Sequence, residues 1–261
     1  STQDRTLFPY TTLFRSIHNI YDGIISSIRG TYDVFPEEKE IPVSDKMSLI
    51  LPAVRMLLSD DKVKTVTVFN SSSVSEIIVD SDSFMRGIPG PFTPDQIVYC
   101  LSDYLYVDNK DTSFEIISDI KSGIDDFKNR KGIYPKVIFI QGEGVIVAEN
   151  SAISTGYLKD IVNDFCRISR LTKNFGGPNP LTQLQVQFIE SWEVENYRKK
   201  VSLGADNAGR LENKIVIVTG AAQGFGAGIA EMLFNEGANI VVADLNEEKG
   251  EEFASQLNEK P

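Results

Sequence analysis

The sequence is poor in the residues that most often bind transition metals. Its 261 residues include one histidine, His18, and two cysteines, Cys100 and Cys166, which are far apart and not in a CxxC arrangement. A catalytic zinc site uses about three protein ligands, mostly histidine or cysteine. We therefore predict no metal site, and we expect the cysteines to be thiols in a reducing compartment. His18 is expected to be a partly buried helix residue.

Positive charge and long apolar runs are also scarce. The chain has 26 Lys and Arg residues against 37 Asp and Glu residues, which gives a formal net charge of −11. Such a surface attracts neither nucleic acid nor an anionic membrane. No apolar run reaches the roughly 20 residues of a membrane-spanning helix, and the N-terminal region does not resemble a signal peptide. We expect a cytoplasmic protein that acts on small molecules.

A glycine-rich turn between an apolar strand and a helix is the most informative feature that the sequence does contain. The glycines of 216–230 follow the pattern Thr-Gly-x-x-x-Gly-x-Gly. Gly220 is predicted to permit a tight turn, Gly224 to let the backbone approach a pyrophosphate, and Gly226 to let the helix pack close to the strand. The first N–H groups of that helix would point at the phosphates.

The helix that follows this turn is predicted to be amphipathic. Ile229, Met232 and Leu233 form its apolar stripe, and Gly237 is expected to end it. A second strand, 239–243, ends in Asp244, an acidic residue that suits the ribose hydroxyls of an adenine dinucleotide.

The pattern predicts a set of cofactor-binding residues and a cofactor. The predicted binding residues are Thr219, Gly220, Ala222, Gln223, Gly224, Phe225, Gly226, Asp244 and Leu245. Asp244 would repel a 2′-phosphate, and no lysine or arginine lies in the glycine turn or directly after Asp244. An NADP site normally supplies such a cation, so we predict NAD in preference to NADP.

Residues 211–261 resemble the short-chain dehydrogenase/reductase family, with Phe225 where that family more often has Ile or Leu. The resemblance implies a Rossmann domain whose catalytic Ser and Tyr-x-x-x-Lys follow the glycine turn, the tyrosine being the acid/base. Tyr106 and Lys110 form such a pattern, but they precede the turn, and we interpret this match as coincidence. We therefore predict no catalytic residue in this chain and no hydride transfer by the chain alone.

The middle of the chain alternates between helical and strand patterns, which indicates an α/β fold. Helices are predicted at 17–29, 44–58 (kinked or split by Pro52), from Pro94, at 113–130, 151–173 and 181–200, and strands at 64–69, 104–107, 136–140 and 145–148. A Gly- and Asn-containing linker is predicted at 204–210.

Residues 17–203 resemble the C-terminal half of the aldolase part of bifunctional class II aldolase/short-chain dehydrogenase proteins. The resemblance is carried by 90–96 (GPFTPDQ), 136–144 (KVIFIQGEG) and 190–198 (ESWEVENYR). It implies a class II aldolase-like α/β region with a role in rhamnose-type sugar-phosphate catabolism, and a homo-oligomeric parent protein. Family members hold zinc on histidines. Gln96 stands where the family often has histidine and is a poor zinc ligand, which argues against zinc here.

Two functions follow from these resemblances. In the first, the chain is part of a fused enzyme that uses NAD to oxidise an aldehyde or alcohol produced by sugar-phosphate cleavage. In the second, the aldolase-like region is a non-catalytic assembly module, as in adducin-type relatives. The partner would then be a sugar-alcohol-phosphate dehydrogenase, for example one that acts on sorbitol 6-phosphate.

The first residues are expected to be foreign to the protein. Residues 6–16 (TLFPYTTLFRS) match the translation of a common short-read sequencing adapter, so we exclude 1–16 from fold reasoning. We expect a fragment from assembled metagenomic reads, with an adapter-derived segment (1–16), an aldolase-like region (17–203), a linker (204–210) and the start of a dinucleotide-binding domain (211–261).

Overall fold

The computed structural model describes residues 17–24, 26, 37–60, 63–191, 209–211 and 214–259. The predicted adapter segment, the end of the predicted 17–29 helix, Trp192 and most of the predicted linker lie outside the described residues. Residues 17–24 are helical, as predicted. The His18 side chain is 74% exposed and lies 3.5 Å from the Asp22 carboxylate. The expectation that His18 is partly buried is therefore wrong.

A mixed sheet of four strands forms the centre of the region from 39 to 191. Its strands are β1 (Thr65–Phe69), β2 (Leu105–Val107), β3 (Val137–Ile140) and β4 (Gly144–Glu149), in the order β1-β4-β3-β2. β4 is antiparallel to both β1 and β3, and β2 is parallel to β3. β1, β2 and β3 therefore run in the same direction, and their carboxyl ends lie at one edge of the sheet.

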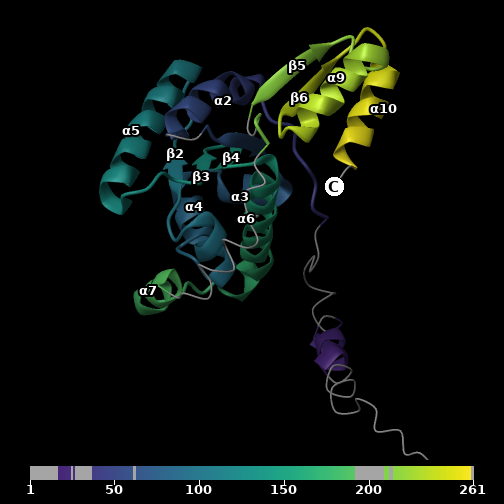
Figure 1. The fold of residues 1–261 in the computed structure, drawn as a ribbon. Helices are drawn as coiled ribbons and strands as arrows, with labels where there is room; N and C mark the ends of the chain where they lie inside the picture. Colours follow the sequence, from purple (N-terminus) through teal and green to yellow (C-terminus); the bar gives the residue numbers. More distant parts are fainter. Residues whose placement is uncertain are drawn as a thin grey trace, which may run out of the picture. The chain divides into compact units, whose positions relative to one another are not determined.

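Helices cover both faces of this sheet (Figure 1). α2 (Asp45–Leu58) and α5 (Ser113–Lys131) pack on one face, whereas α3 (Ser72–Ile77), α4 (Ser81–Gly87) and α6 (Ala152–Thr172) pack on the other. Successive side chains of a β-strand point to opposite faces of the sheet, so one strand contributes residues to the hydrophobic core on each face. In β3, Phe139 belongs to the core under α6 and Ile138 to the core under α2 and α5.

Local capping residues define where several of these helices begin. Ser44 caps α2 by accepting a hydrogen bond from the Met47 N–H, so the helix predicted at 44–58 begins where it was expected. α2 continues through Pro52 as one helix, so of the two effects predicted for Pro52, a kink or a split, the split is wrong. α3 and α4 were not predicted, because six- and seven-residue helices are too short to show an apolar period.

The chain between β2 and α4 contains an unusual helix. It starts at Pro94, as predicted, and has π-helical spacing in η1 (Gln96–Cys100). Leu101, which follows, has φ 73°, a left-handed conformation that leucine rarely adopts. α6 is followed by η2 (Lys173–Phe175) and α7 (Gln183–Ser191). Within the described residues, no helix is both long and apolar enough to cross a membrane.

Residues 214–259 fold as a separate βαβα unit. It consists of β5 (Ile215–Thr219), α9 (Gly224–Asn235), β6 (Asn239–Ala243) and α10 (Glu247–Asn258), and β5 and β6 are parallel. Gly237 ends α9 as predicted: its φ is 89°, and the next N–H, that of Ala238, donates to the Leu233 carbonyl across 3.0 Å.

The apolar stripe predicted for α9 is only partly correct. Leu233 packs against the core of this unit, but Ile229 is 51% and Met232 is 70% exposed. Ala230 is fully buried instead. The small side chain of Ala230 faces the strands because the glycine-rich first turn brings α9 close to β5.

Candidate functional site

The carboxyl ends of β5 and β6 lie side by side, and the glycine turn starts from this edge. The Gly220 N–H donates to the Ala243 carbonyl at the end of β6, across 2.8 Å. Gly220 has φ 63° and Gly224 has φ 61°, so both need the left-handed region that glycine adopts most easily. The prediction of a tight turn at Gly220 is confirmed. In open α/β sheets this edge is where ligands bind.

Gly226 sets the distance between α9 and β5. A Cβ atom at this position would lie 2.0 Å from the Gly220 carbonyl oxygen, a distance that no side chain could tolerate without moving the helix. The predicted close packing is therefore confirmed. At Gly224, in contrast, a Cβ would meet no atom within 4 Å. The space beside Gly224 is therefore open to an incoming group.

The N-terminus of α9 presents backbone donors at this edge. Gln223 is the N-cap residue in extended conformation, and its side chain forms no capping hydrogen bond with the described helix. The first turn of a helix carries N–H groups without intrahelical partners and a partial positive charge. Phe225, in this turn, is 95% exposed. The arrangement can bind an anionic group such as a pyrophosphate.

Asp244 lies next to the same turn. Its carboxylate accepts hydrogen bonds from the Asn246 N–H at 2.9 Å and the Ala222 N–H at 3.0 Å. These backbone donors hold the pKa of Asp244 below its ordinary value. A carboxylate has about four acceptor positions. Asp244 thus stays ionised and retains acceptor capacity for a further partner.

A cation that the sequence pattern did not indicate also lies at this turn. Lys249, in the first turn of α10, donates a hydrogen bond from Nζ to Gln223 Oε1 across 2.9 Å. Its charge also helps to lower the pKa of Asp244. The prediction rested on the absence of a cation in the turn or directly after Asp244, but the fold brings one from five residues further on. Asn246 caps α10 and so orients this residue.

The remaining predicted residues surround this turn. Thr219 ends β5 in register with Ala243 of β6. Leu245 is fully exposed, directly after Asp244. The structure thus gathers the predicted residues along one edge of the βαβα unit.

The sequence of this unit matches a known family. Residues 214–261 match the short chain dehydrogenase family. The chain is 24% identical over 260 residues to the "Uncharacterized oxidoreductase YuxG" of Bacillus subtilis, a match that covers 93% of this chain and 36% of that protein. It is 47% identical over 49 residues to the 7alpha-hydroxysteroid dehydrogenase of Bacteroides fragilis, which is 19% of each chain. The D-threitol dehydrogenase of Mycolicibacterium smegmatis is 47% identical over 55 residues, which is 21% of each.

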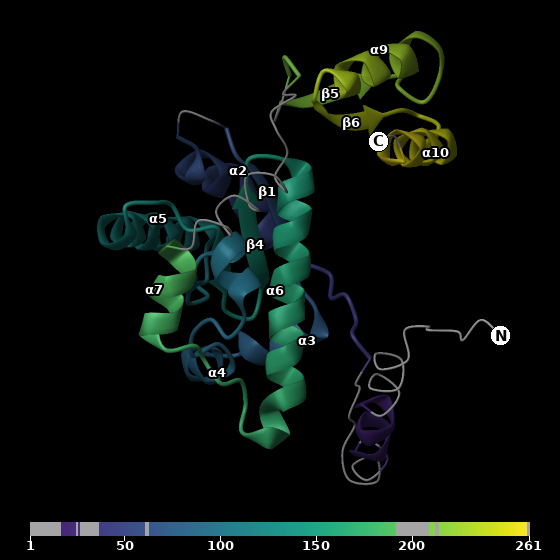
Figure 2. The ribbon, with the colours of Figure 1, turned by 60° about the horizontal axis from the view of Figure 1, so that its bottom comes forward.

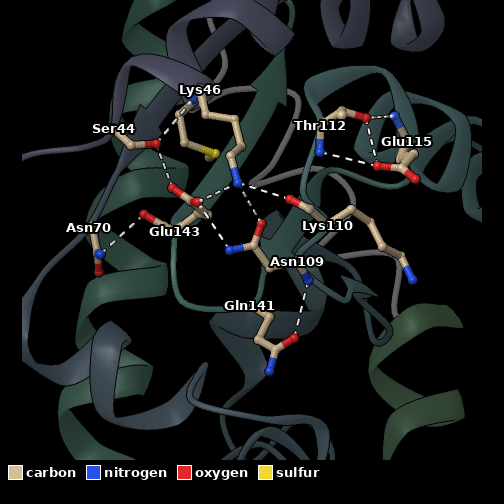
Figure 3. Close-up of polar contacts among 10 residues, drawn as sticks. Ser44, Lys46, Asn70, Asn109, Lys110, Thr112, Glu115, Gln141 and Glu143 are labelled. Atoms are coloured by element: carbon tan, nitrogen blue, oxygen red, sulfur yellow. Dashed lines mark hydrogen bonds and ion pairs between the residues drawn. The ribbon is translucent and has the colours of Figure 1, made fainter.

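A second group of polar side chains lies at the carboxyl ends of β1, β2 and β3 (Figure 3). Glu143, in the β3–β4 turn, accepts hydrogen bonds from Ser44 Oγ at 2.5 Å and Asn109 Nδ2 at 3.1 Å, and Lys46 Nζ lies 3.4 Å away. Lys46 also donates to the Lys110 carbonyl. Burial alone would raise the pKa of Glu143, but these donors outweigh it and lower the pKa. These contacts connect three segments of the chain: the start of α2, the loop after β2 and the β3–β4 turn.

Gln96, which we expected to be a poor zinc ligand, is completely buried. Its Oε1 accepts hydrogen bonds from the Phe92 N–H at 2.8 Å and the Thr93 N–H at 2.9 Å. Its Nε2 donates to the Tyr104 hydroxyl. Gln96 therefore organises the turn before η1. Among the described residues, no group of three or more His, Cys, Asp or Glu side chains is placed to hold a metal ion.

The Tyr106–Lys110 pair does not have the properties of an acid/base pair. Burial, with smaller contributions from Asp108 and Asp80, raises the pKa of Tyr106 to about 12. Its buried hydroxyl has no hydrogen-bond partner within the part of the chain that the structure describes. Lys110 Nζ lies 3.5 Å from the Asp119 carboxylate. A lysine that assists catalysis would lower the tyrosine pKa, so the interpretation as coincidence is supported.

Proposed function

We propose that this chain carries the dinucleotide-binding part of an NAD-dependent short-chain oxidoreductase. The observation that carries the proposal is the geometry of one edge, where the left-handed glycines of the turn, the open N-terminus of α9 and the ionised Asp244 meet. The match of residues 214–261 to the short chain dehydrogenase family supports it.

The residues of this edge fit the parts of NAD. The N–H groups of the first turn of α9 would bind the pyrophosphate, and Gly224 would leave room for it. Asp244 would accept hydrogen bonds from the adenosine ribose hydroxyls and repel a 2′-phosphate. The nicotinamide, when bound, accepts or donates the hydride. The residues that would hold the substrate and move its proton are not among those that we identify in this chain.

We further propose that the region 39–191 is class II aldolase-like and that the whole protein is bifunctional. It would oxidise an aldehyde or alcohol produced by cleavage of a sugar phosphate of the rhamnose type. The match to YuxG supports a fused arrangement, because it runs through both regions of this chain. The mixed sheet with helices on both faces is compatible with an α/β aldolase-like domain. The parent would be a cytoplasmic homo-oligomer, in keeping with the buried thiols of Cys100 and Cys166.

A second candidate is a sugar-alcohol-phosphate dehydrogenase, for example for sorbitol 6-phosphate, with a non-catalytic aldolase-like module. The internal hydrogen bonds of Gln96 favour this candidate, because they occupy the side chain that stands at a histidine position of the aldolases. A zinc assay on the product of the complete reading frame separates the two. One zinc per subunit supports the aldolase, and none supports the module.

The cofactor proposal is tested by titrating NADH and NADPH into this chain and following nicotinamide fluorescence. We expect NADH to bind about tenfold more tightly, because Asp244 disfavours the 2′-phosphate. Asp244→Ala should remove most of this preference, whereas Asp125→Ala, on the exposed surface of α5, should preserve it. Equal affinity for both dinucleotides would refute the preference. Failure of both to bind would refute the dinucleotide site in this chain.

A further inference from the structure

A cavity with a cationic lining lies between α3, α4, α6 and the turn that follows α6. Its volume is about 400 Å³, and three basic side chains line it, those of Arg86, Arg170 and Lys173, against a single carboxylate, that of Glu76. α3, α4 and α6, which supply most of its lining residues, contact one another, and their ribbons are drawn in Figure 2. We propose that this cavity binds the phosphate group of a small phosphorylated molecule. This inference does not depend on the dinucleotide proposal.

The charge around the cavity favours an anion, even though helix ends contribute negative charge. Arg86 lies in the last turn of α4 and Arg170 in the last turn of α6, where cations stabilise the carbonyl end of a helix. Each such end carries about half a negative charge at most, and less in short helices such as α3 and α4. Among the residues that line the cavity, three basic side chains stand against one carboxylate, so the lining itself has an excess of positive charge. Asp80, which is not part of the lining, also interacts with the charge of Arg86.

Polar contacts on the cavity wall hold the two arginines in place. Arg170 Nε lies 2.7 Å from the Glu76 carboxylate, and the Arg170 side chain is only 17% exposed. Arg86 donates to Ser83 Oγ across 3.2 Å. This second contact orients one guanidinium edge toward α4 and leaves further donors for a ligand, since a guanidinium has five N–H groups. The N–H donors of a guanidinium are spaced so that two of them can bind two oxygens of one phosphate.

The floor of the cavity is closely packed. Ser169 Oγ donates to the Gly87 carbonyl across 2.6 Å, which ties α6 to the end of α4. A Cβ at Gly87 would lie 3.1 Å from Ile77 Cγ1 and 3.3 Å from Ser169 Oγ. The absence of a side chain at Gly87 thus lets the two helices meet. A preformed floor lowers the cost of ordering a site when a ligand binds.

The turn after α6 forms the rim. Gly176 has φ 97° and Gly177 has φ 81°, and the Gly177 N–H donates to the Thr172 carbonyl across 2.9 Å. A Cβ at either glycine would meet no atom within 4 Å. At Gly176 and Gly177 the rim therefore consists of backbone without side chains. Pro178 and Ile77 add apolar surface to the lining.

The size and lining of the cavity indicate the class of ligand. A volume of about 400 Å³ falls in the range of small-molecule sites and exceeds what a bare phosphate ion needs. The cations would bind the phosphate, and the apolar wall would contact the carbon skeleton.

The test is isothermal titration of the full chain with glycerol 3-phosphate, inorganic phosphate, glycerol and acetate. We expect glycerol 3-phosphate to bind more tightly than inorganic phosphate, and glycerol and acetate not to bind. The double variant Arg86→Gln/Lys173→Gln should weaken glycerol 3-phosphate binding by about tenfold or more, because charge-assisted hydrogen bonds are lost. Arg170 is left intact because it also pairs with Glu76.

The matched control is Lys121→Gln/Arg130→Gln, which removes two charges from α5, on the other side of the sheet. It should leave the affinity unchanged, and thermal unfolding should show that both double variants fold. Absence of glycerol 3-phosphate binding overturns the proposal, as does equal weakening by the two double variants. Equal binding of acetate and glycerol 3-phosphate overturns the assignment to phosphate.

Discussion

The ammonium group of Lys249 donates a hydrogen bond to the side-chain oxygen of Gln223, across 2.9 Å. The contact joins the first turn of α10 to the N-cap of α9. The Lys249 charge therefore lies beside the glycine turn. The Ala222 N–H of the same turn donates a hydrogen bond to the Asp244 carboxylate. The preference for one dinucleotide over the other should therefore depend on the balance between Asp244 and Lys249.

Removal of the Lys249 charge should sharpen the preference for NADH. In Lys249→Gln, we expect NADPH to bind several-fold more weakly and NADH to bind almost as before, because only the 2′-phosphate adds charge near this site. Lys249→Arg should retain the wild-type ratio. Fluorescence titration of both nucleotides measures it. An unchanged ratio in Lys249→Gln would show that the cation does not contribute.

Gly226→Ala should destabilise the βαβα unit. The new methyl group would lie 2.0 Å from the Gly220 carbonyl oxygen, so α9 must move away from β5. We expect a loss of about 2 kcal/mol or more, as for other sites of steric overlap. Hydrogen exchange of the β5 amides measures this loss in the unit itself.

Gly228→Ala is the matched control for that variant. It lies in the same helix, and its Cβ would meet no atom within 4 Å. Alanine should stabilise α9 there by up to about 1 kcal/mol, because it has the higher helix propensity. If both variants changed β5 protection in the same direction, the close contact at Gly226 would not be the cause.

Tyr106→Phe should stabilise the region from 39 to 191 by about 1 kcal/mol. The buried Tyr106 hydroxyl has no hydrogen-bond partner among the described residues, and burying such a group costs free energy. The ring would keep its stacking on Phe84, 4.7 Å between centroids. Tyr104→Phe should instead destabilise the protein, because the Tyr104 hydroxyl accepts a hydrogen bond from Gln96. Urea denaturation of the two variants measures both effects. A less stable Tyr106→Phe would mean that the hydroxyl has a partner in solution.

The Glu143 group should make stability depend on pH in the acid range. Its pKa in the folded protein is below the ordinary value of 4.5. The stabilisation is therefore fully present above pH 4.5 and is lost as the pH falls through the folded pKa. The difference in unfolding free energy between wild type and Glu143→Gln should shrink over this window. A difference that stayed constant down to pH 3 or so would exclude this group as the cause.

Elements whose signals are local could be predicted from the sequence. The Ser44 cap, the β3–β4 hairpin and the turn at Gly220 each depend on residues a few positions apart. α3 and α4 could not be predicted, because such short helices are stabilised by packing against α6 and the sheet.

The sequence by itself determined the glycine turn and the acidic residue at the end of β6, because the chemistry of a phosphate-binding turn resides in consecutive residues. Only the tertiary structure decided that Lys249 contacts this turn. It alone also brought Arg170 to Glu76, which lies 94 residues earlier (170 − 76), at the wall of the cavity. Contacts between distant segments depend on how helices pack on the sheet, and the order of residues along one segment does not encode that packing.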